Sequence, residues 1–229
     1  SGKTNLALAL ADALPVRLIS MDSALVFKGM DIGTAKPDAA TLAHYPHDLI
    51  DIIAPEQSYS AAQFCADAKR LIQAAHQQNK IAVLVGGTLL YYKALIEGLN
   101  DLPSADASIR QQLEAEQAQH GLGYLYQQLQ QFDPITAARL TPNDSQRIQR
   151  ALEIYHSAGE PMSNLLAREQ RQGLGLPCLT IALNPSNRSV LHQRISTRFD
   201  QMLEQGFLTE VQTLKQNPAL HADLPAMRC

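Results

Sequence analysis

The sequence has few cysteines, no long apolar run and no excess of positive charge. Its three cysteines, Cys65, Cys178 and Cys229, lie far apart and lack the spacing of metal ligands. Their odd number argues against a disulfide framework, so we expect reduced thiols in a cytoplasmic protein. No stretch of 18 or more apolar residues occurs, which argues against a membrane-spanning helix.

The formal net charge of −3 does not indicate nucleic-acid binding. Proteins that hold a nucleic-acid duplex non-specifically usually carry a basic excess, so any such contact in this protein would have to be local. The chain has 229 residues, of which 45% are apolar. This size and composition suit one large domain, or one domain with a smaller insertion.

Strand and helix patterns alternate along the first hundred residues. The strongest strand signal is a continuous apolar run at residues 81–85, of the kind buried on both faces of a parallel sheet. A helix begins at Ser60, where Gln63 completes a capping box. This alternation predicts an α/β fold with a parallel sheet flanked by helices, and the P-loop motif described below makes the expected sheet P-loop NTPase-like. The expected strands are residues 16–21, 81–85 and, more weakly, 48–53, and the other expected helices are residues 2–13 and 89–96.

Residues 104–171 show helical patterns and no convincing strand. The chain then returns to a strand pattern at 178–183 and to a long helix at 186–205, which Gly206 ends. We therefore expect an α/β catalytic core from residues 1–103 and 172–229, interrupted by an all-helical insertion domain of residues 104–171. The insertion carries six arginines and eight acidic residues, so contact with phosphates would need its arginines gathered on one face.

Ser1-Gly2-Lys3-Thr4 contains the last positions of a P-loop, Gly-x-x-x-x-Gly-Lys-Ser/Thr. The amides at a helix N-terminus point toward a bound anion, and the helix dipole favours negative charge there. Lys3 would supply a cation and the Thr4 hydroxyl a ligand for Mg²⁺. An ordinary helix start remains the alternative. A P-loop follows a strand, so we expect the sequence to be a fragment.

Asp22 comes directly after the strand expected at residues 16–21. Ligands of open α/β sheets bind outside the carboxyl ends of the strands, and the long polar loop at residues 22–37 is of the kind that carries function. Asp22 is therefore a candidate general base. A carboxylate that caps a turn or binds Mg²⁺ through water is the alternative.

The loop at residues 22–37, Gly86-Gly87-Thr88 and Gln146-Arg147-Ile148-Gln149-Arg150 together resemble the bacterial tRNA dimethylallyltransferase family. The resemblance covers essentially the whole chain. It implies transfer of a dimethylallyl group from dimethylallyl diphosphate to N6 of the adenosine 3′ to the anticodon of tRNA. Family members continue beyond Cys229, so the chain looks truncated at both ends. The resemblance also implies a cytoplasmic monomer with Mg²⁺ as cofactor and no membrane contact.

Site residues follow from the same resemblance. It implies that Asp22 is the catalytic base, that Thr88 lies close to the reacting centre, and that Arg198 clamps the diphosphate. The diphosphate-binding set is then Ser1, Gly2, Lys3, Thr4 and Arg198, with Thr4 as the metal ligand. The implied tRNA contacts are Asp22, Ser23, Ala24, Leu25, Thr88, Arg110, Gln146, Arg147, Ile148, Gln149 and Arg150.

Helical spacing is compatible with two of these roles but does not establish them. Arg147 and Arg150 are three residues apart, on a side of their helix away from Ile148, where they could bind phosphate or form a solvated face. Arg194 and Arg198 are four residues apart and could engage a diphosphate or be surface charges.

Three other functions fit part of the pattern. A P-loop small-molecule kinase that binds ATP would share the sheet, the Gly-Lys-Thr sequence and the arginine-bearing helix. An isopentenyltransferase acting on free adenine nucleotides would share the P-loop and Asp22, although the insertion favours a polynucleotide acceptor. The third alternative is an RNA-binding module without catalytic activity.

Overall fold

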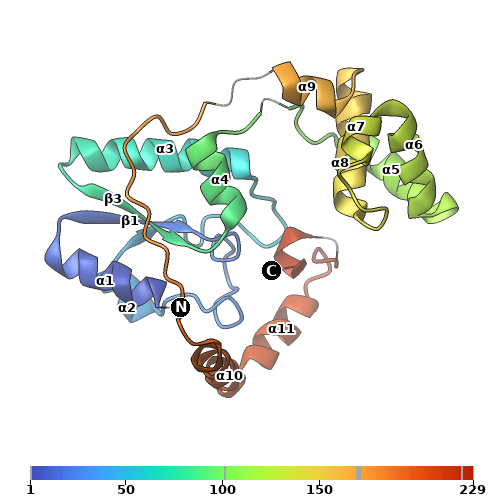
Figure 1. Ribbon diagram of the computed structural model, residues 1–229. Coiled ribbons are helices and arrows are strands. Elements are labelled where there is room, and N and C mark those ends of the chain that lie inside the picture. Colours follow the sequence, from blue (N-terminus) through green and yellow to red (C-terminus); the bar gives the residue numbers. More distant parts are fainter. Residues whose placement is uncertain (1, 101, 169–171, 223, 229) are drawn as a thin grey trace. The chain divides into compact units, whose positions relative to one another are not determined.

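The computed structural model describes residues 2–100, 102–168, 172–222 and 224–228. It divides into two compact units (Figure 1): Ser1–Gly98 with Gly173–Cys229, and Leu99–Gln172. The first unit contains a parallel sheet with helices, and the second contains helices and no strand among its described residues. The fold class expected from the sequence, an α/β core interrupted by a helical insertion, is confirmed.

Three parallel strands form the sheet of the first unit, in the order β2-β1-β3. They are β1 (Val16–Met21), β2 (His47–Asp48) and β3 (Ile81–Gly86). The central β1 pairs with β3 along its whole length, from Val16 opposite Ile81 to Met21 opposite Gly86. Both strands therefore end at the same edge of the sheet, which brings the loops after them together.

The strand expected at residues 48–53 is mostly wrong. Only β2 and a single bridge between Phe27 and Ile53 form in this region. Leu49 and Asp51 have positive φ values of 64° and 55°, which an extended strand cannot contain. The short β2 is also attached to β1 by side chains, because the Arg17 guanidinium donates to both carboxylate oxygens of Asp48 at 2.7 and 3.0 Å.

Helices α3 (Ala61–Gln77) and α4 (Leu89–Glu97) pack on the sheet. The predicted capping box at the start of α3 is present, with reciprocal hydrogen bonds between Ser60 and Gln63. The apolar face of α3 is buried against Ile19 of β1, Tyr91 and Leu95 of α4, and their neighbours. Helices α1 (Lys3–Ala13) and α2 (Ala39–His44) complete this part of the unit.

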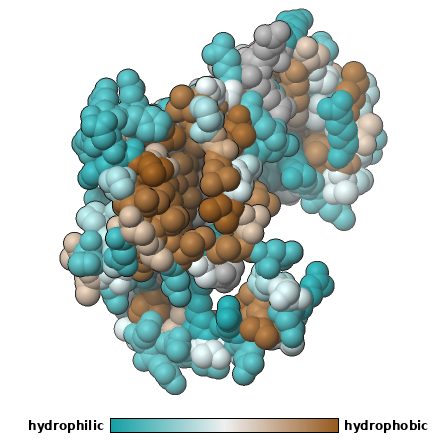
Figure 2. Space-filling view, turned by 60° about the vertical axis from the view of Figure 1, so that its left-hand side comes forward, coloured by the Kyte–Doolittle hydropathy of each residue, from teal (hydrophilic) through white to brown (hydrophobic). Residues whose placement is uncertain are grey.

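The strand expected at residues 178–183 does not form among the described residues. Leu179 is 89% exposed and Ile181 57% exposed, and strands need a hydrogen-bonded neighbour. In the described part of the chain β3 pairs only with β1, so most of β3 is half-buried and not buried on both faces as expected. Both segments line a groove of about 500 Å³, and the α/β unit presents a large apolar area in Figure 2.

Two helices near the C-terminus complete the first unit. The helix expected at residues 186–205 is confirmed as α10 (Arg188–Glu204), with Asn187 as its N-cap. Gly206, with a φ of 98°, separates it from α11 (Phe207–Lys215). Leu214 of α11 packs against a small core formed by Val26, Phe27, Met30 and Ala226. The last described element is the 3-10 helix η1 (Pro225–Arg228).

The second unit consists of packed helices around one apolar core. Leu113, Leu125, Leu129, Ile148 and Leu152 form this core and are at most 1% exposed. The helical pattern expected over this segment is present, and two of its helices begin after Asp106 and Asp144 as N-caps. The described helices are α5 (Ala107–His120), α6 (Leu122–Phe132), α7 (Pro134–Ala137), α8 (Ser145–Ala158) and α9 (Met162–Arg168).

A buried carboxylate joins α6, α7 and α9. Asp133 is 1% exposed and accepts hydrogen bonds from the Thr136 amide and hydroxyl and from the Ser163 amide, at 3.0, 2.7 and 2.9 Å. Burial alone would raise its pKa, but the hydrogen bonds from Ser163 and Thr136 outweigh burial and lower the pKa below its ordinary value.

We predict that Asp133→Asn destabilises the helical unit by about 2 kcal/mol at pH 7, because the amide NH₂ would face a buried donor. Since the folded pKa is lowered, the contribution of Asp133 is present above its unfolded pKa of about 3.9 and is lost as pH falls through the folded value. Urea unfolding at pH 7 and below pH 4 measures both effects. Glu114→Gln, on the exposed surface of α5, is the control; equal stability of the two variants would contradict the prediction.

Candidate functional site

The loops after β1 and β3 meet at the carboxyl ends of the two strands. Asp22 follows β1, and Gly86 is the last residue of β3. A Cβ atom on Gly86 would lie 1.9 Å from the carbonyl oxygen of Met21, so only glycine permits this approach of the two backbones. The strand pairing and this glycine together bring Asp22 and Thr88 to one site.

Thr88 binds the first residues of the loop after β1. The Ser23 amide donates to Thr88 Oγ1 at 3.0 Å, and the Thr88 hydroxyl donates to Ser23 Oγ at 3.2 Å. Thr88 is the N-cap residue of α4, yet its side chain makes no capping hydrogen bond. Its hydroxyl is therefore committed to positioning the loop of Ser23.

The Asp22 carboxylate is only partly engaged. Its Oδ1 accepts a hydrogen bond from the Ala24 amide at 3.0 Å, which fixes the turn at Asp22, Ser23 and Ala24. Its Oδ2 accepts no hydrogen bond within the ranges that the structure describes. One oxygen thus orients the carboxylate while the other is available to a substrate, as a general base requires.

Lys3 lies beside this cluster at the start of α1. A Cβ atom on Gly87 would be 3.5 Å from Lys3 Nζ, so the ammonium group lies next to the Gly86–Thr88 turn. Gly2 is the N-cap of α1 with a φ of 88°, and no side chain caps this end of the helix. The amides at a helix N-terminus are suited to bind an anion. Ser1, also expected to bind the diphosphate, lies outside the described residues.

Thr4 is an exposed residue in the first turn of α1. No group of three or more His, Cys, Asp or Glu side chains suitable for a metal ion occurs among the described residues. Mg²⁺ commonly takes one or two protein ligands and completes its coordination with substrate phosphates and water. The Thr4 hydroxyl fits this role in combination with a bound diphosphate.

Arg198 is not placed with Lys3. It is an exposed residue of α10 that lines a cavity of about 450 Å³ with Lys36, Asp38 and Asp51, whereas Lys3 lines the groove beside β3. The role of Arg198 as a diphosphate clamp remains a prediction. Arg194 is likewise exposed on α10.

Two of the arginines expected to contact tRNA bind a buried glutamate. Glu153 is 2% exposed, and its carboxylate lies 3.3 Å from Arg110 and 3.0 Å from Arg150. Arg150 also donates to the carbonyl of Pro103 at 2.5 Å. The sequence did not lead us to expect a role for Glu153. Its position three residues after Arg150 on one helix could have indicated the ion pair between them.

The rest of the expected tRNA-binding stretch divides into exposed and buried residues. Gln146 and Arg147 are exposed, and Arg147 pairs with Asp144 at 3.3 Å. Gln149 donates to Gln117 at 3.1 Å. Ile148 is fully buried in the core of the unit, so its side chain packs the insertion and cannot reach a partner.

Ser23, Ala24 and Leu25 are half-buried at the beginning of the loop after β1. The Leu25 carbonyl accepts a hydrogen bond from the Asp51 amide at 3.1 Å, which ties this stretch to the segment after β2. Among the described residues, the helices are all too short or too polar to cross a membrane.

These features define an α/β protein with a carboxylate, a threonine hydroxyl and a lysine at the carboxyl ends of parallel strands. The family model described as IPP transferase matches residues 25–229. The chain belongs to this family of transferases.

Relatives with high sequence identity cover the whole chain. A tRNA dimethylallyltransferase of Neisseria meningitidis serogroup C (strain 053442) is 54% identical over 229 residues, and one of Dechloromonas aromatica (strain RCB) is 56% identical. In both comparisons the alignment covers 100% of this chain and 73% of the relative.

Solved structures show the same fold. The full-length tRNA isopentenylpyrophosphate transferase of Bacillus halodurans matches with a TM-score of 0.60 and 34% identity, over 100% of this chain and 70% of that one. A eukaryotic dimethylallyltransferase acting on tRNA matches with a TM-score of 0.72 and 27% identity, over 94% of this chain and 53% of that one.

The contacts of α8 predict that alanine substitutions of its two arginines will change stability by different amounts. Arg150→Ala should destabilise the helical unit by about 2 kcal/mol, because it removes a partner of a buried carboxylate. Arg147→Ala, a matched change on the exposed surface, should alter stability by less than about 0.5 kcal/mol. Chemical unfolding of both variants measures the difference, and equal losses would refute the assignment of Arg150 to the Glu153 pair.

Proposed function

We propose that this chain transfers a dimethylallyl group from dimethylallyl diphosphate to N6 of the adenosine 3′ to the anticodon of tRNA. The observation that carries the proposal is the meeting of Asp22, Thr88 and Lys3 at the carboxyl ends of β1 and β3. A carboxylate suited to an amine thus lies on the same edge as a lysine and helix N-terminus suited to a diphosphate. Relatives at 54–56% identity that carry the name tRNA dimethylallyltransferase support this choice of substrates.

The reaction forms a nitrogen–carbon bond, breaks a carbon–oxygen bond and transfers one amine proton to a base. The N6 amine attacks the prenyl carbon, the carbon–oxygen bond to the diphosphate breaks, and a proton leaves the amine. Negative charge grows on the departing diphosphate, so the first amides of α1 and the Lys3 ammonium would stabilise the transition state there. Mg²⁺ bound to the diphosphate and Thr4 would supply additional positive charge.

Asp22 would act on the acceptor. Its Oδ1 is held by the Ala24 amide, so Oδ2 can accept a hydrogen bond from the N6 amine and then its proton. Thr88 would support this geometry through its two hydrogen bonds with Ser23. Orientation of the amine against the prenyl carbon is a large part of the rate acceleration such a site can provide.

The helical insertion would supply contacts to the tRNA. Gln146 and Arg147 are exposed on α8, and Arg110 remains 52% exposed although it pairs with Glu153. These side chains could donate hydrogen bonds to phosphates or base edges. The target adenosine stacks on its neighbours in free tRNA, so it would have to leave the stack to reach Asp22.

The alternatives receive less support. The relatives and solved structures described above are all transferases acting on tRNA by name, and none of these names describes a kinase or an enzyme of free nucleotides. Cytoplasmic location and a monomeric state remain predictions from the sequence.

One assay tests the proposed function. The full-length protein is incubated with tRNA and either dimethylallyl diphosphate or ATP, and the anticodon-loop adenosine is analysed by mass spectrometry. We expect a dimethylallyl adduct at N6 of the adenosine 3′ to the anticodon with the prenyl donor alone. A phosphorylated product with ATP, or modification of free adenine nucleotides in place of tRNA, would favour one of the alternatives.

Substitutions of Asp22 and of Lys3 should change different kinetic constants. We predict that Asp22→Ala lowers kcat by roughly 10²- to 10⁴-fold, as for loss of a general base, with tRNA affinity nearly unchanged. Lys3→Ala should instead raise the KM for dimethylallyl diphosphate, and Lys28→Ala, on the exposed part of the loop, should not. Steady-state kinetics with each substrate varied measures this. Equal losses of turnover and tRNA affinity in Asp22→Ala would remove Asp22 from the base role.

A further inference from the structure

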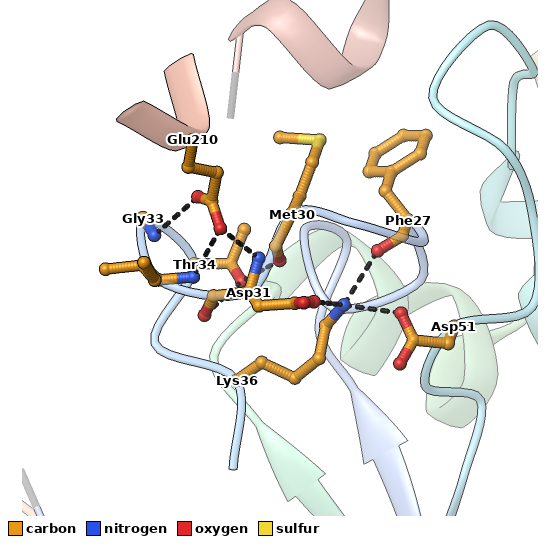
Figure 3. A network of polar contacts seen from close by, with 9 residues as sticks. Phe27, Met30, Asp31, Gly33, Thr34, Lys36, Asp51 and Glu210 are labelled. Atoms are coloured by element: carbon orange, nitrogen blue, oxygen red, sulfur yellow. Dashed lines mark hydrogen bonds and ion pairs between the residues drawn. The ribbon is translucent and has the colours of Figure 1, made fainter. Parts of the chain in front are cut away.

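One carboxylate of α11 binds three consecutive amides of the loop that follows Asp22. Glu210 accepts hydrogen bonds from the backbone N–H groups of Asp31 and Ile32 at 2.8 Å each and of Gly33 at 3.0 Å. Figure 3 shows the carboxylate facing these amides. Oε2 receives the first two and Oε1 the third. Since all three partners are donors, the arrangement requires acceptors at both oxygen positions.

A second side chain of α11 contacts the same turn. Phe207 lies three residues before Glu210, on the same face of the helix. A Cβ atom on Gly33 would lie 2.4 Å from Cε2 of the Phe207 ring, so the ring packs directly on the glycine. Helix α11 therefore holds residues 31–33 by a carboxylate and by an aromatic ring.

The buried side chain of Lys36 connects the two ends of this loop. Its side chain is 3% exposed, and its ammonium donates to the Phe27 carbonyl at 2.9 Å and to the Asp31 carboxylate at 2.6 Å, and pairs with Asp51. These contacts are visible in Figure 3. The turn that Glu210 binds and the base of the loop at Phe27 are thus joined through one buried cation.

The base of the loop is joined in turn to the stretch next to Asp22. The Phe27 amide donates to the Ala24 carbonyl at 3.4 Å, and Val26 and Phe27 are buried against Leu214 of α11. A displacement of residues 31–33 would therefore be transmitted through Lys36 and Phe27 to Ala24, whose amide orients the Asp22 carboxylate.

We propose that Glu210 is a positioning residue for the acceptor side of the reaction, which acts on Asp22 and Ser23 through the loop at residues 24–36. This inference rests on the proposed function. Lys3 and the helix N-terminus expected to bind the donor belong to α1, whereas the loop that Glu210 holds carries the acceptor residues. Arg198, also expected to bind the donor, belongs to α10 and lines a cavity with Lys36 of this loop, so the KM for the donor reports on any effect of the loop there.

Glu210→Gln in the full-length protein tests the inference, because its NH₂ group would face a backbone N–H. We expect kcat/KM for tRNA to fall at least about tenfold, since small misplacements of reacting groups are costly, while the KM for dimethylallyl diphosphate stays within about twofold. Hydrogen exchange at residues 31–33 should accelerate. Glu204→Gln removes an exposed carboxylate at the end of α10 and should change none of these quantities.

Glu210→Asp provides the conservative comparison. It keeps the charge but withdraws the carboxylate by one methylene, so it should recover part of the loss in kcat/KM for tRNA. A melting curve for each variant measures the folded fraction. Equal losses for both substrates, or losses explained by unfolding alone, would overturn the positioning role.

The activity of the wild-type protein distinguishes a failure of this inference from a failure of the proposed function. A wild type that transfers no dimethylallyl group to tRNA would overturn the proposed function, and the positioning role with it. An active wild type whose Glu210→Gln variant has unchanged kinetics would overturn the positioning role alone.

Discussion

Parallel pairing of β1 with β3 is the constraint on which the site depends. The pairing runs without interruption from Val16 and Ile81 to Met21 and Gly86, so both strands end at one edge. Gly86 permits the final approach, because a side chain there would overlap the backbone of Met21. Without this register, the Thr88 hydroxyl could not bind Ser23, and the Asp22 carboxylate would lack its neighbour.

The two units use carboxylates in comparable ways. In the helical unit, Asp133 and Glu153 are buried and saturated with donors from several helices. In the α/β unit, Glu210 binds a row of backbone amides. In each case a carboxylate accepts hydrogen bonds or ion pairs from donors on other segments and so fixes those segments relative to one another. Asp22 differs because one of its oxygens has no such partner among the described residues, which suits a reactive group.

The contacts of the acidic residues explain how an insertion with a net negative charge could still bind RNA. Its acidic residues outnumber its arginines, yet Glu153 and Asp133 are used internally, as the N-caps Asp106 and Asp144 are. Acidic side chains that hold helices together contribute less to repelling RNA than exposed ones would. Of the two arginines of α8, Arg147 is exposed and Arg150 is held by the buried Glu153, so Arg147 is the better placed to contact phosphate without loss of stability.

The sequence by itself determined the alternation of strands and helices, the capping box at Ser60 and the helical insertion, because these depend on local periodicity and short motifs. It also singled out Asp22, whose catalytic role stays a prediction. Only the tertiary structure decided that residues 178–183 form no strand, that Arg110 and Arg150 share the buried Glu153, and that Lys36 and Glu210 hold the loop after Asp22. Glu210 and Asp31 are 179 residues apart. Such contacts depend on how distant elements pack, and no local pattern in either segment encodes them.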